Sequence, residues 1–285
     1  MKQLIRSEKR ASIGKDPLSL LLRFLVILAA AITFGVLLFL IGYILVQGIP
    51  YLTPSLFALK YTTENVSLFP AIITTLEMVF LSLSIAVPLG LFTAIYLVEY
   101  AHKGNKLVEV IRLTAETLSG IPSIVYGLFG LLFFVTYLNW GFSILAGAVT
   151  MSIMILPLIM RTSEEALKSV PDSYREASFG LGAGRLRTVF RIVLPSALPG
   201  ILAGLILGIG RIVGETAALL YTAGTVAQIP PSVFASGRTL SLHMYILSSE
   251  GLYTDQAYAT AVVLLLTVLL INILSVYVAK KFTKE

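Results

Sequence analysis

Charged side chains occur in two stretches of this sequence that are otherwise apolar. Arg211 and Glu215 lie four residues apart in one stretch, with Thr216 beside them, and Glu77 lies in another. An arginine in the middle of a membrane helix costs about 3 kcal/mol on insertion scales, and such charges usually mark the pathway of a solute or ion. On one helix, Glu215 would share a face with Arg211 and neutralise it. The pair therefore predicts either an anion pathway or a static bridge that fixes helix packing.

Residue counting suggests a second partner for Arg211. Thirteen residues separate Leu198 from Arg211, which at about 1.5 Å per residue puts the arginine roughly 20 Å from one membrane surface. Glu77 lies seven residues after Pro70, roughly 10 Å below the other surface by the same rise. In a core of about 30 Å these depths coincide. The alternative is that Glu77 lies at the level of the lipid headgroups.

Three glycines precede Arg211 at intervals of four residues. Gly200, Gly204 and Gly208 lie on the face that carries Arg211 if the segment is helical. A glycine row of this kind lets another backbone approach closely. We expect a neighbouring helix or a substrate to lie against it.

The composition excludes a soluble globule. Of 285 residues, 57% are hydrophobic and 13% are charged, about half the charged share of a soluble domain. Disordered chains have the opposite bias. The absence of cysteine excludes disulfides and thiolate metal sites, and two histidines leave little to bind a metal, so we expect no metal site.

Six apolar runs are long enough to cross a bilayer. They are residues 24–49, 70–98, 122–138, 140–160, 198–220 and 257–279. The third is short, but the amphipathic stretch 106–118 leads into it across Gly120, Ile121 and Pro122. We therefore expect one broken helix there, with Pro122 as the first residue of its membrane half. The first run is too long for a cleavable signal peptide and is expected to remain as an anchor.

The basic residues fix the expected orientation. Alternate hydrophilic segments hold 18 Lys and Arg against two in the others, so the positive-inside rule places both termini in the cytoplasm. Residues 1–23 are then a cytoplasmic segment, and residues 24–285 form one membrane domain with an internal loop 161–197 and an external loop 221–256. Topology alone accounts for the net charge of +6, so we expect no nucleic-acid partner.

Nucleotide binding by this chain is excluded by its motifs. The Gly14-Lys15 pair is followed by Asp16 and lacks the upstream glycine of a P-loop. Residues 208–214 resemble a dinucleotide fingerprint but have one residue too many and follow no strand. We expect no enzymatic activity and no cofactor in this chain.

The internal loop 161–197 predicts two short helices. Thr162 with Glu165, and Ser173 with Glu176, have the spacing of capping boxes. Gly182, among other glycines, would interrupt the second helix. By residue chemistry alone, the loop is either a stiff element for a partner or a solvated basic loop that only fixes topology.

The same loop contains a long spaced pattern. It reads Glu176-Ala177-Ser178, three residues, Gly182, nine residues, then Ile192, Leu194 and Pro195. This resembles the EAA signature of ABC importer permeases, from which only Ser178 departs. The resemblance implies a six-helix type I permease fold and a coupling helix that docks on a cytoplasmic ATPase. Glu176, Ala177, Ser178 and Gly182 would form the coupling helix and its turn, and Ile192, Leu194 and Pro195 would lead into the fifth span.

Residues 211–217, Arg-Ile-Val-Gly-Glu-Thr-Ala, also resemble a stretch of phosphate-specific ABC permeases of the PstA type. The likeness extends over about residues 70–280. It implies a multi-pass protein of the prokaryotic inner membrane that works with a PstC-type permease, an ATPase dimer carrying ATP and Mg²⁺, and an extracytoplasmic phosphate-binding protein received by loop 221–256. Arg211, Glu215, Thr216 and Glu77 would then line the substrate pathway, and the planar fork of an arginine matches a phosphate or a sulfate.

Three alternatives remain at this stage. One is an ABC permease for another oxyanion or small solute. Another is an ion-coupled secondary transporter in which Glu77, Arg211 and Glu215 form the relay. The last is a membrane scaffold without transport, which would leave the charges in the apolar runs unexplained.

Overall fold

The computed structural model describes residues 17–102 and 104–283, and all regular secondary structure in this part of the chain is helical. Five helices are long and apolar enough to cross a membrane, and a bent pair adds a sixth span if it is counted as one. The expected all-α membrane fold is therefore confirmed. The α-helices are α2 (Pro17–Gly48), α3 (Phe69–Ile95), α4 (Lys106–Ser119), α5 (Ser123–Gly130), α6 (Ile144–Lys168), α7 (Asp172–Gly180), α8 (Arg185–Thr188), α9 (Leu194–Val213), α10 (Ala217–Leu220), α11 (Leu240–Glu250) and α12 (Thr254–Thr283).

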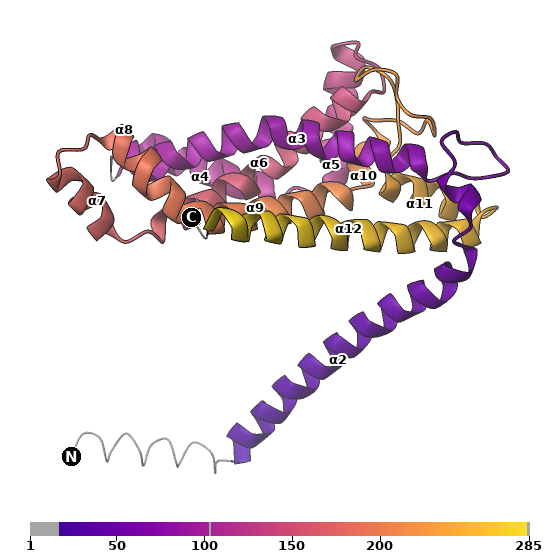
Figure 1. Ribbon diagram of the computed structural model, residues 1–285, viewed down its shortest axis with the longest axis horizontal. Helices are drawn as coiled ribbons and strands as arrows, with labels where there is room; N and C mark the ends of the chain where they lie inside the picture. The colour runs from indigo at the N-terminus through magenta and orange to yellow at the C-terminus, as the bar shows by residue number, and fades with distance from the viewer. Residues whose placement is uncertain (1–16, 103, 284–285) are drawn as a thin grey trace.

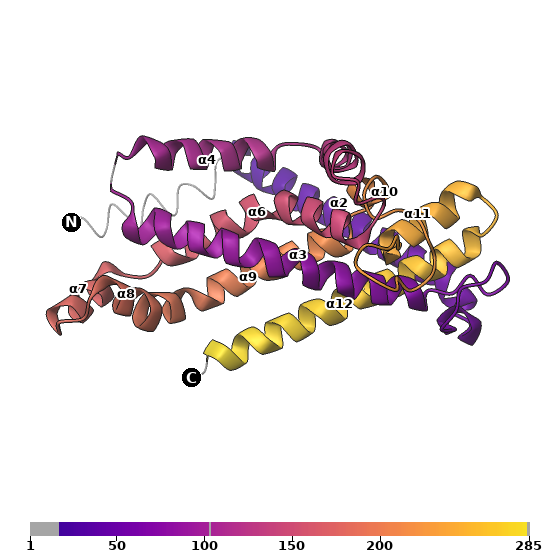
Figure 2. The same ribbon diagram turned by 90° about the horizontal axis from the view of Figure 1, so that it is seen from above.

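Helices α3 and α6 form the central pair and lie side by side in both views (Figures 1 and 2). Small residues bring their backbones together: the Ser152 hydroxyl donates to the Ser82 carbonyl at 3.0 Å. A methyl group on Gly90 would collide with Ile159. Fully buried Met78 and Ile155 belong to the apolar core around this contact. Because the pair is packed at backbone distance, it has little freedom to slide.

Helix α9 also packs against α6, through the glycine row. A methyl group on Gly200 would lie 2.7 Å from the Ala166 Cβ, and one on Gly204 would overlap Thr162. Gly208 faces Ile159 in the same way. The expected close approach is confirmed, and the neighbour is α6.

Helix α2 leaves the bundle at an angle and contacts it mainly at its C-terminal end (Figure 1). There Gly48 lies against the backbone of Tyr258 in α12, and Tyr43 packs edge-on against the Tyr258 ring. Most of its apolar side chains are exposed. An apolar helix of this length needs lipid or another protein around it.

The third span is broken more sharply than the sequence indicates. Helices α4 and α5 meet at a bend of 100°. Pro122 has an extended ψ of 142° and caps α5 instead of starting it, which corrects the expected boundary by one residue. Beyond the bend, Gly127 lies against the backbone of Ala218 in α10. The tight packing of α5 on α10 accounts for the change of direction.

The expected helix start at Thr162 is wrong. Helix α6 continues to Lys168, and the Thr162 hydroxyl donates to the Leu158 carbonyl of the preceding turn. Glu165 pairs with Arg161 instead of reaching back. Apolar contacts of Ala166 and Leu167 with α3 and α9 extend the helix past the end of the apolar run.

The second expected capping box is also absent. Helix α7 is capped by Pro171, with no side-chain hydrogen bond from Ser173. After the turn, one continuous helical segment runs from Arg185 to Val213, through α8, a π-helical turn and α9. The fifth span is therefore shifted toward the N-terminus of the expected run 198–220. Gly214 ends it, because the chain turns there into α10.

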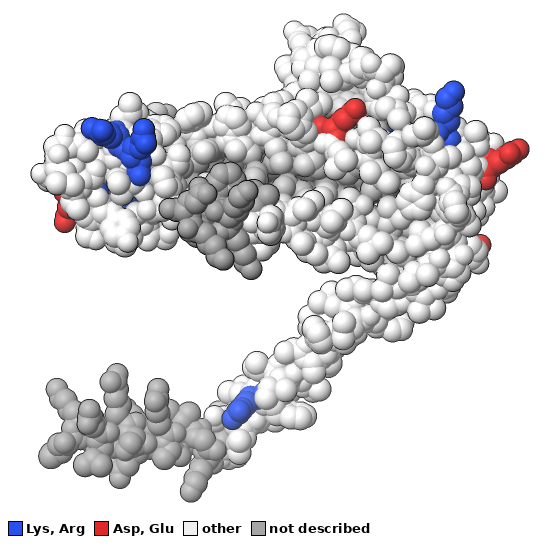
Figure 3. All heavy atoms as spheres, in the orientation of Figure 1, with Lys and Arg blue, Asp and Glu red and all other residues white. Residues whose placement is uncertain are grey.

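The start of α2 and the end of α12 both point to the side of the molecule that carries α7 (Figure 1). Lys and Arg gather over α7 and α8 on the face shown in Figure 3. We call this the α7 end, and the opposite side, with α11, the α11 end. The charge distribution predicts that the α7 end faces the cytoplasm.

The glycine row yields a test of packing. Gly204→Ala should lower the free energy of unfolding by about 1–3 kcal/mol, because the new methyl group meets Thr162. Gly210→Ala is the matched control, since nothing lies within 4 Å of its Cβ position. Thermal unfolding of the purified protein in detergent measures both. Equal stability of the two variants would contradict the close contact between α6 and α9.

Candidate functional site

A groove of about 650 Å³ runs between α4, α6 and α9. Arg211 lines it, together with Pro157 and Thr162 of α6 and Ser119 at the end of α4. The rest of the wall is partly apolar, and it also contains six charged side chains, which are Arg112, Glu116, Arg161, Glu164, Glu165 and Lys168. The groove thus brings charges together between helices that are mainly apolar, and charges in such a position usually mark the pathway of a solute.

Most of the charges in this groove already have partners. Glu164 is nearly buried, and one of its oxygens lies 2.6 Å from both Arg112 and Lys168. Glu165 lies 3.2 Å from Arg161 in an exposed pair. The Arg112–Glu164 contact fastens α4 to α6 and so fixes the width of the groove.

Arg211 and Glu116 are the exceptions, since neither side chain forms an ion pair among the described residues, and Arg211 is the one cation of the two. Arg211 lies in the last turn of α9, its side chain is exposed in this subunit, and it forms no ion pair with any carboxylate of the described residues. Its guanidinium is therefore free to receive an anion that enters the groove.

The expected pairing of Arg211 with Glu215 is wrong. Helix α9 ends at Val213, so the two residues are not on one helix face. The Glu215 carboxylate instead accepts a hydrogen bond from the Ala218 amide at 3.0 Å, at the start of α10. Its backbone carbonyl accepts from the Ser241 hydroxyl at 2.6 Å. Glu215 thus stabilises the break after α9 and its contact with α11.

Glu77 and Thr216 are not brought into the groove either. Glu77 is half-buried on α3, and no ion pair with Arg211 occurs among the described residues. Thr216 precedes α10 and is half-buried. Of the four residues that the sequence predicts for the pathway, the groove contains only Arg211. The pathway roles of the other three stay predictions.

Sequence reasoning missed Arg161 and Arg112 as groove residues. Arg161 follows the fourth apolar run directly, and Arg112 lies on the amphipathic stretch before the bend. The position of Arg161 at the edge of a span could have marked it as a candidate groove residue. The extension of α6 to Lys168, which brings these residues together, was not readable from the apolar run.

The predicted coupling residues form a compact hairpin at the α7 end. Ala177, Ser178, Gly182 and Ile192 line a hollow of about 430 Å³ between α7 and the start of the next helix. The Ser178 hydroxyl lies 2.8 Å from the Thr188 hydroxyl, which closes the hairpin.

Gly182 has a φ of +82°, a conformation that costs side-chain-bearing residues about 1–2 kcal/mol. Beside it, Leu181 is 90% exposed. Glu176 is exposed, whereas Leu194 is half-buried and Pro195 exposed at the start of α9. The hairpin therefore presents a small, partly apolar tip to a partner.

The α11 end carries a buried basic group. The Arg238 guanidinium stacks over the Tyr61 ring at 4.9 Å. Its Nε and Nη2 atoms are buried and without hydrogen bonds among the described residues. His243 of α11 is 1% exposed and packs edge-on against the same tyrosine. Burial, aided by the charge of Arg238, lowers the pKa of His243 to about 3, so the imidazole is neutral in the fold.

The family described as binding-protein-dependent transport system inner membrane component matches residues 86–284. The chain belongs to this family. It is thus a multi-pass permease subunit of an ABC importer in the inner membrane, and nucleotide binds to a separate ATPase subunit. The importer also includes a binding protein. Membership removes the ion-coupled transporter and the scaffold from the alternatives.

Relatives and solved structures agree with this assignment. The probable ABC transporter permease protein YqgI of Bacillus subtilis (strain 168) is 34% identical over 90% of this chain and 94% of its own length. The phosphate transport system permease protein PstA 1 of Mycobacterium tuberculosis (strain CDC 1551 / Oshkosh) is 37% identical over 66% of this chain and 62% of its own.

Two solved importers share the fold. A bacterial alginate ABC transporter in complex with its periplasmic protein aligns with a TM-score of 0.71 at 19% identity, covering 96% of this chain and 98% of the other. The inward-facing MetNI methionine ABC transporter aligns with a TM-score of 0.59 at 22% identity, covering 76% of this chain and 94% of the other. At these identities the likeness concerns the fold alone.

His243 predicts a pH-dependent stability. An unfolded histidine has a pKa near 6.5, so below that pH the unfolded chain binds a proton that the fold excludes. Stability should be fully present above about pH 6.5 and fall by up to about 1.4 kcal/mol per pH unit as the pH drops toward 3. Thermal unfolding between pH 7.5 and 5 measures the slope. His243→Leu should make the stability depend less steeply on pH. The control is His102→Gln, which replaces an exposed histidine and should leave the slope as it is. An unchanged slope in His243→Leu would contradict the effect of His243 burial on stability.

Proposed function

We propose that this permease subunit conducts inorganic phosphate as the PstA-type half of a heterodimer with a PstC-type permease. Arg211, exposed in a polar groove and without an ionic partner among the described residues, carries this proposal. A guanidinium offers paired donors that match the oxygens of a phosphate. A relative over 66% of this chain is named as a phosphate permease, which supports the same substrate.

A groove with one unpaired arginine suits a conduit. Tight binding would hold the anion in the membrane, whereas a single charge-assisted contact lets it leave. Selection then belongs to the extracytoplasmic phosphate-binding protein, which in this proposal is received by loop 221–256 at the α11 end. Another oxyanion such as sulfate is the second candidate, because its oxygens fit the same fork.

The hairpin of α7 is the proposed docking element for the ATPase. Its exposed Leu181 and the hollow lined by Ala177 and Gly182 offer a small apolar surface with close access to backbone. Because α8 and α9 are one continuous helical segment, movement of the hairpin reaches Arg211 through about 26 residues of helix. Glu176, Ser178, Ile192, Leu194 and Pro195 are the further residues of this proposed coupling element.

The substrate proposal is tested by uptake into proteoliposomes that hold the complete importer, with ATP and Mg²⁺ on the ATPase side. Labelled phosphate should enter and labelled sulfate should not. Arg211→Ala should lower phosphate uptake about 10- to 100-fold, the value of a lost hydrogen bond to a charged group. Arg23→Ala removes an equal charge from an exposed position on α2, outside the groove and the hairpin, and should leave uptake unchanged. Phosphate uptake near the wild-type rate in Arg211→Ala would show that the arginine has a structural role. Faster uptake of sulfate than of phosphate would show that sulfate is the substrate.

The coupling proposal is tested at the turn. Gly182→Val forces a β-branched residue into a positive φ and should distort the hairpin while membrane insertion stays intact. ATP hydrolysis should then continue with little phosphate uptake. Gly184→Val is the control, since Gly184 has a φ of −75° and nothing lies within 4 Å of its Cβ position. Full uptake by Gly182→Val would remove the coupling role.

A further inference from the structure

Helix α7 is joined to the bundle in an unusual way. None of its residues is buried, so apolar packing contributes little to its position. Among the described residues, every side-chain hydrogen bond from α7 to α3 or to the end of α6 comes from Arg175. One side chain therefore holds the proposed coupling helix against α3 and α6.

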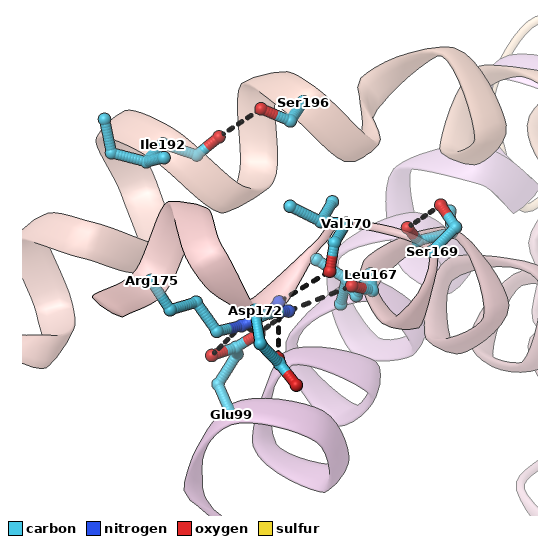
Figure 4. A network of polar contacts seen from close by, with 9 residues as sticks. Glu99, Leu167, Ser169, Val170, Asp172, Arg175, Ile192 and Ser196 are labelled. Carbon is cyan, nitrogen blue, oxygen red and sulfur yellow. Dashed lines mark hydrogen bonds and ion pairs between the residues drawn. The ribbon is translucent and has the colours of Figure 1, made fainter. Parts of the chain in front are cut away.

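Figure 4 shows how Arg175 reaches across three elements. Its Nη2 atom lies 2.7 Å from the Glu99 carboxylate at the end of α3, and Nε donates to the same group at 3.1 Å. Nη2 also donates to the Leu167 carbonyl at 3.0 Å, and Nη1 to the Val170 carbonyl at 2.8 Å. A weaker contact at 3.3 Å joins Nη1 to Asp172. All three guanidinium nitrogens are thus engaged.

One of the two carbonyls lies just before the connector between α6 and α7, and the other lies within it. Leu167 belongs to the last turn of α6, and Val170 lies between Ser169 and Pro171. A connector of three residues could act as a hinge, about which α7 would turn without moving α6. By binding carbonyls at both positions, Arg175 braces this connector.

Glu99 extends the brace to α3. It lies in the π-helical turn Tyr96–Tyr100 that ends this helix, and its side chain is 6% exposed. A carboxylate this buried requires its counter-charge, because removing one partner leaves an uncompensated charge in a low-dielectric site. Helix α3 must therefore follow any displacement of Arg175 or lose the pair.

We propose that the Arg175–Glu99 pair is the link that makes α7 move as one body with α3 and α6, so that these two residues position the helices for coupled transport. Arg175 and Glu99 then act through the helices that they hold and touch no substrate. This inference rests on the proposed coupling role of α7. In this inference, movement of α7 reaches α3 and α6 through the Arg175–Glu99 pair. This route is additional to the continuous helix that leads from the turn into α9.

Three variants of the complete importer in proteoliposomes test this link. Glu99→Gln removes the counter-charge, and Arg175→Lys keeps the charge but offers one compact donor group instead of a planar fork. Asp172→Asn is the matched control, because it removes the 88% exposed partner of the same guanidinium. The measurement is labelled phosphate taken up per ATP hydrolysed, normalised to assembled complex. A purely structural role changes the amount of complex but leaves this ratio as it is.

The ratio should fall about tenfold in Glu99→Gln, by a smaller factor in Arg175→Lys, and not at all in Asp172→Asn, within the range of effects known for residues along a coupling route. ATP hydrolysis should persist in all three. If Glu99→Gln or Arg175→Lys assembles and shows the wild-type ratio, the proposal is overturned. It is also overturned if both variants fail to assemble while Asp172→Asn assembles normally, because the pair would then serve assembly alone.

Gly182→Val separates this failure from failure of the proposed function. If Gly182→Val uncouples and Glu99→Gln does not, the brace is wrong while the coupling role of α7 holds. If neither variant uncouples, α7 itself is not the coupling element.

Discussion

The close approach of α6 to its two neighbours is the constraint on which the rest of the structure depends. Gly90 and Ser152 hold α3 on one side, and the glycine row of α9 holds the other. Because side chains of α6 fit directly against glycines of both neighbours, these three helices cannot slide independently. The groove, its charges and the coupling hairpin are all built on this unit, because α6 forms one wall of the groove and ends at the connector to α7.

Charge pairing then divides the ionisable residues by role. Glu164 is held between Arg112 and Lys168, and Glu99 is held by Arg175, so these carboxylates fix helices relative to one another. Arg211 has no such partner among the described residues and faces the groove. An unpaired cation attracts an anion. The same physical rule that makes the other pairs structural makes Arg211 the candidate substrate contact.

The two ends of the molecule are built differently. At the α7 end, α7 is exposed and fastened by polar contacts, which suits an element that is displaced by a partner. At the α11 end, Arg238 and His243 are buried around Tyr61, and α11 is tied to the break after α9 through Ser241. The continuous helical segment from Arg185 to Val213 runs from the α7 end toward the α11 end and contains Arg211. In the coupling proposal, this segment transmits movement of the hairpin to Arg211.

The membrane class, the approximate positions of the spans and the EAA pattern could be predicted from the sequence, because they depend on composition, on the length of apolar runs and on the spacing of residues 176–195. The sequence also predicted the glycine row, since an interval of four residues implies one helix face. Tertiary structure alone decided where helices end. Apolar contacts of Leu167 carry α6 past Thr162, and the turn at Gly214 separates Arg211 from Glu215. Local patterns contain no information about such contacts, so the partners of Arg175 and the open position of Arg211 could be seen only in the fold.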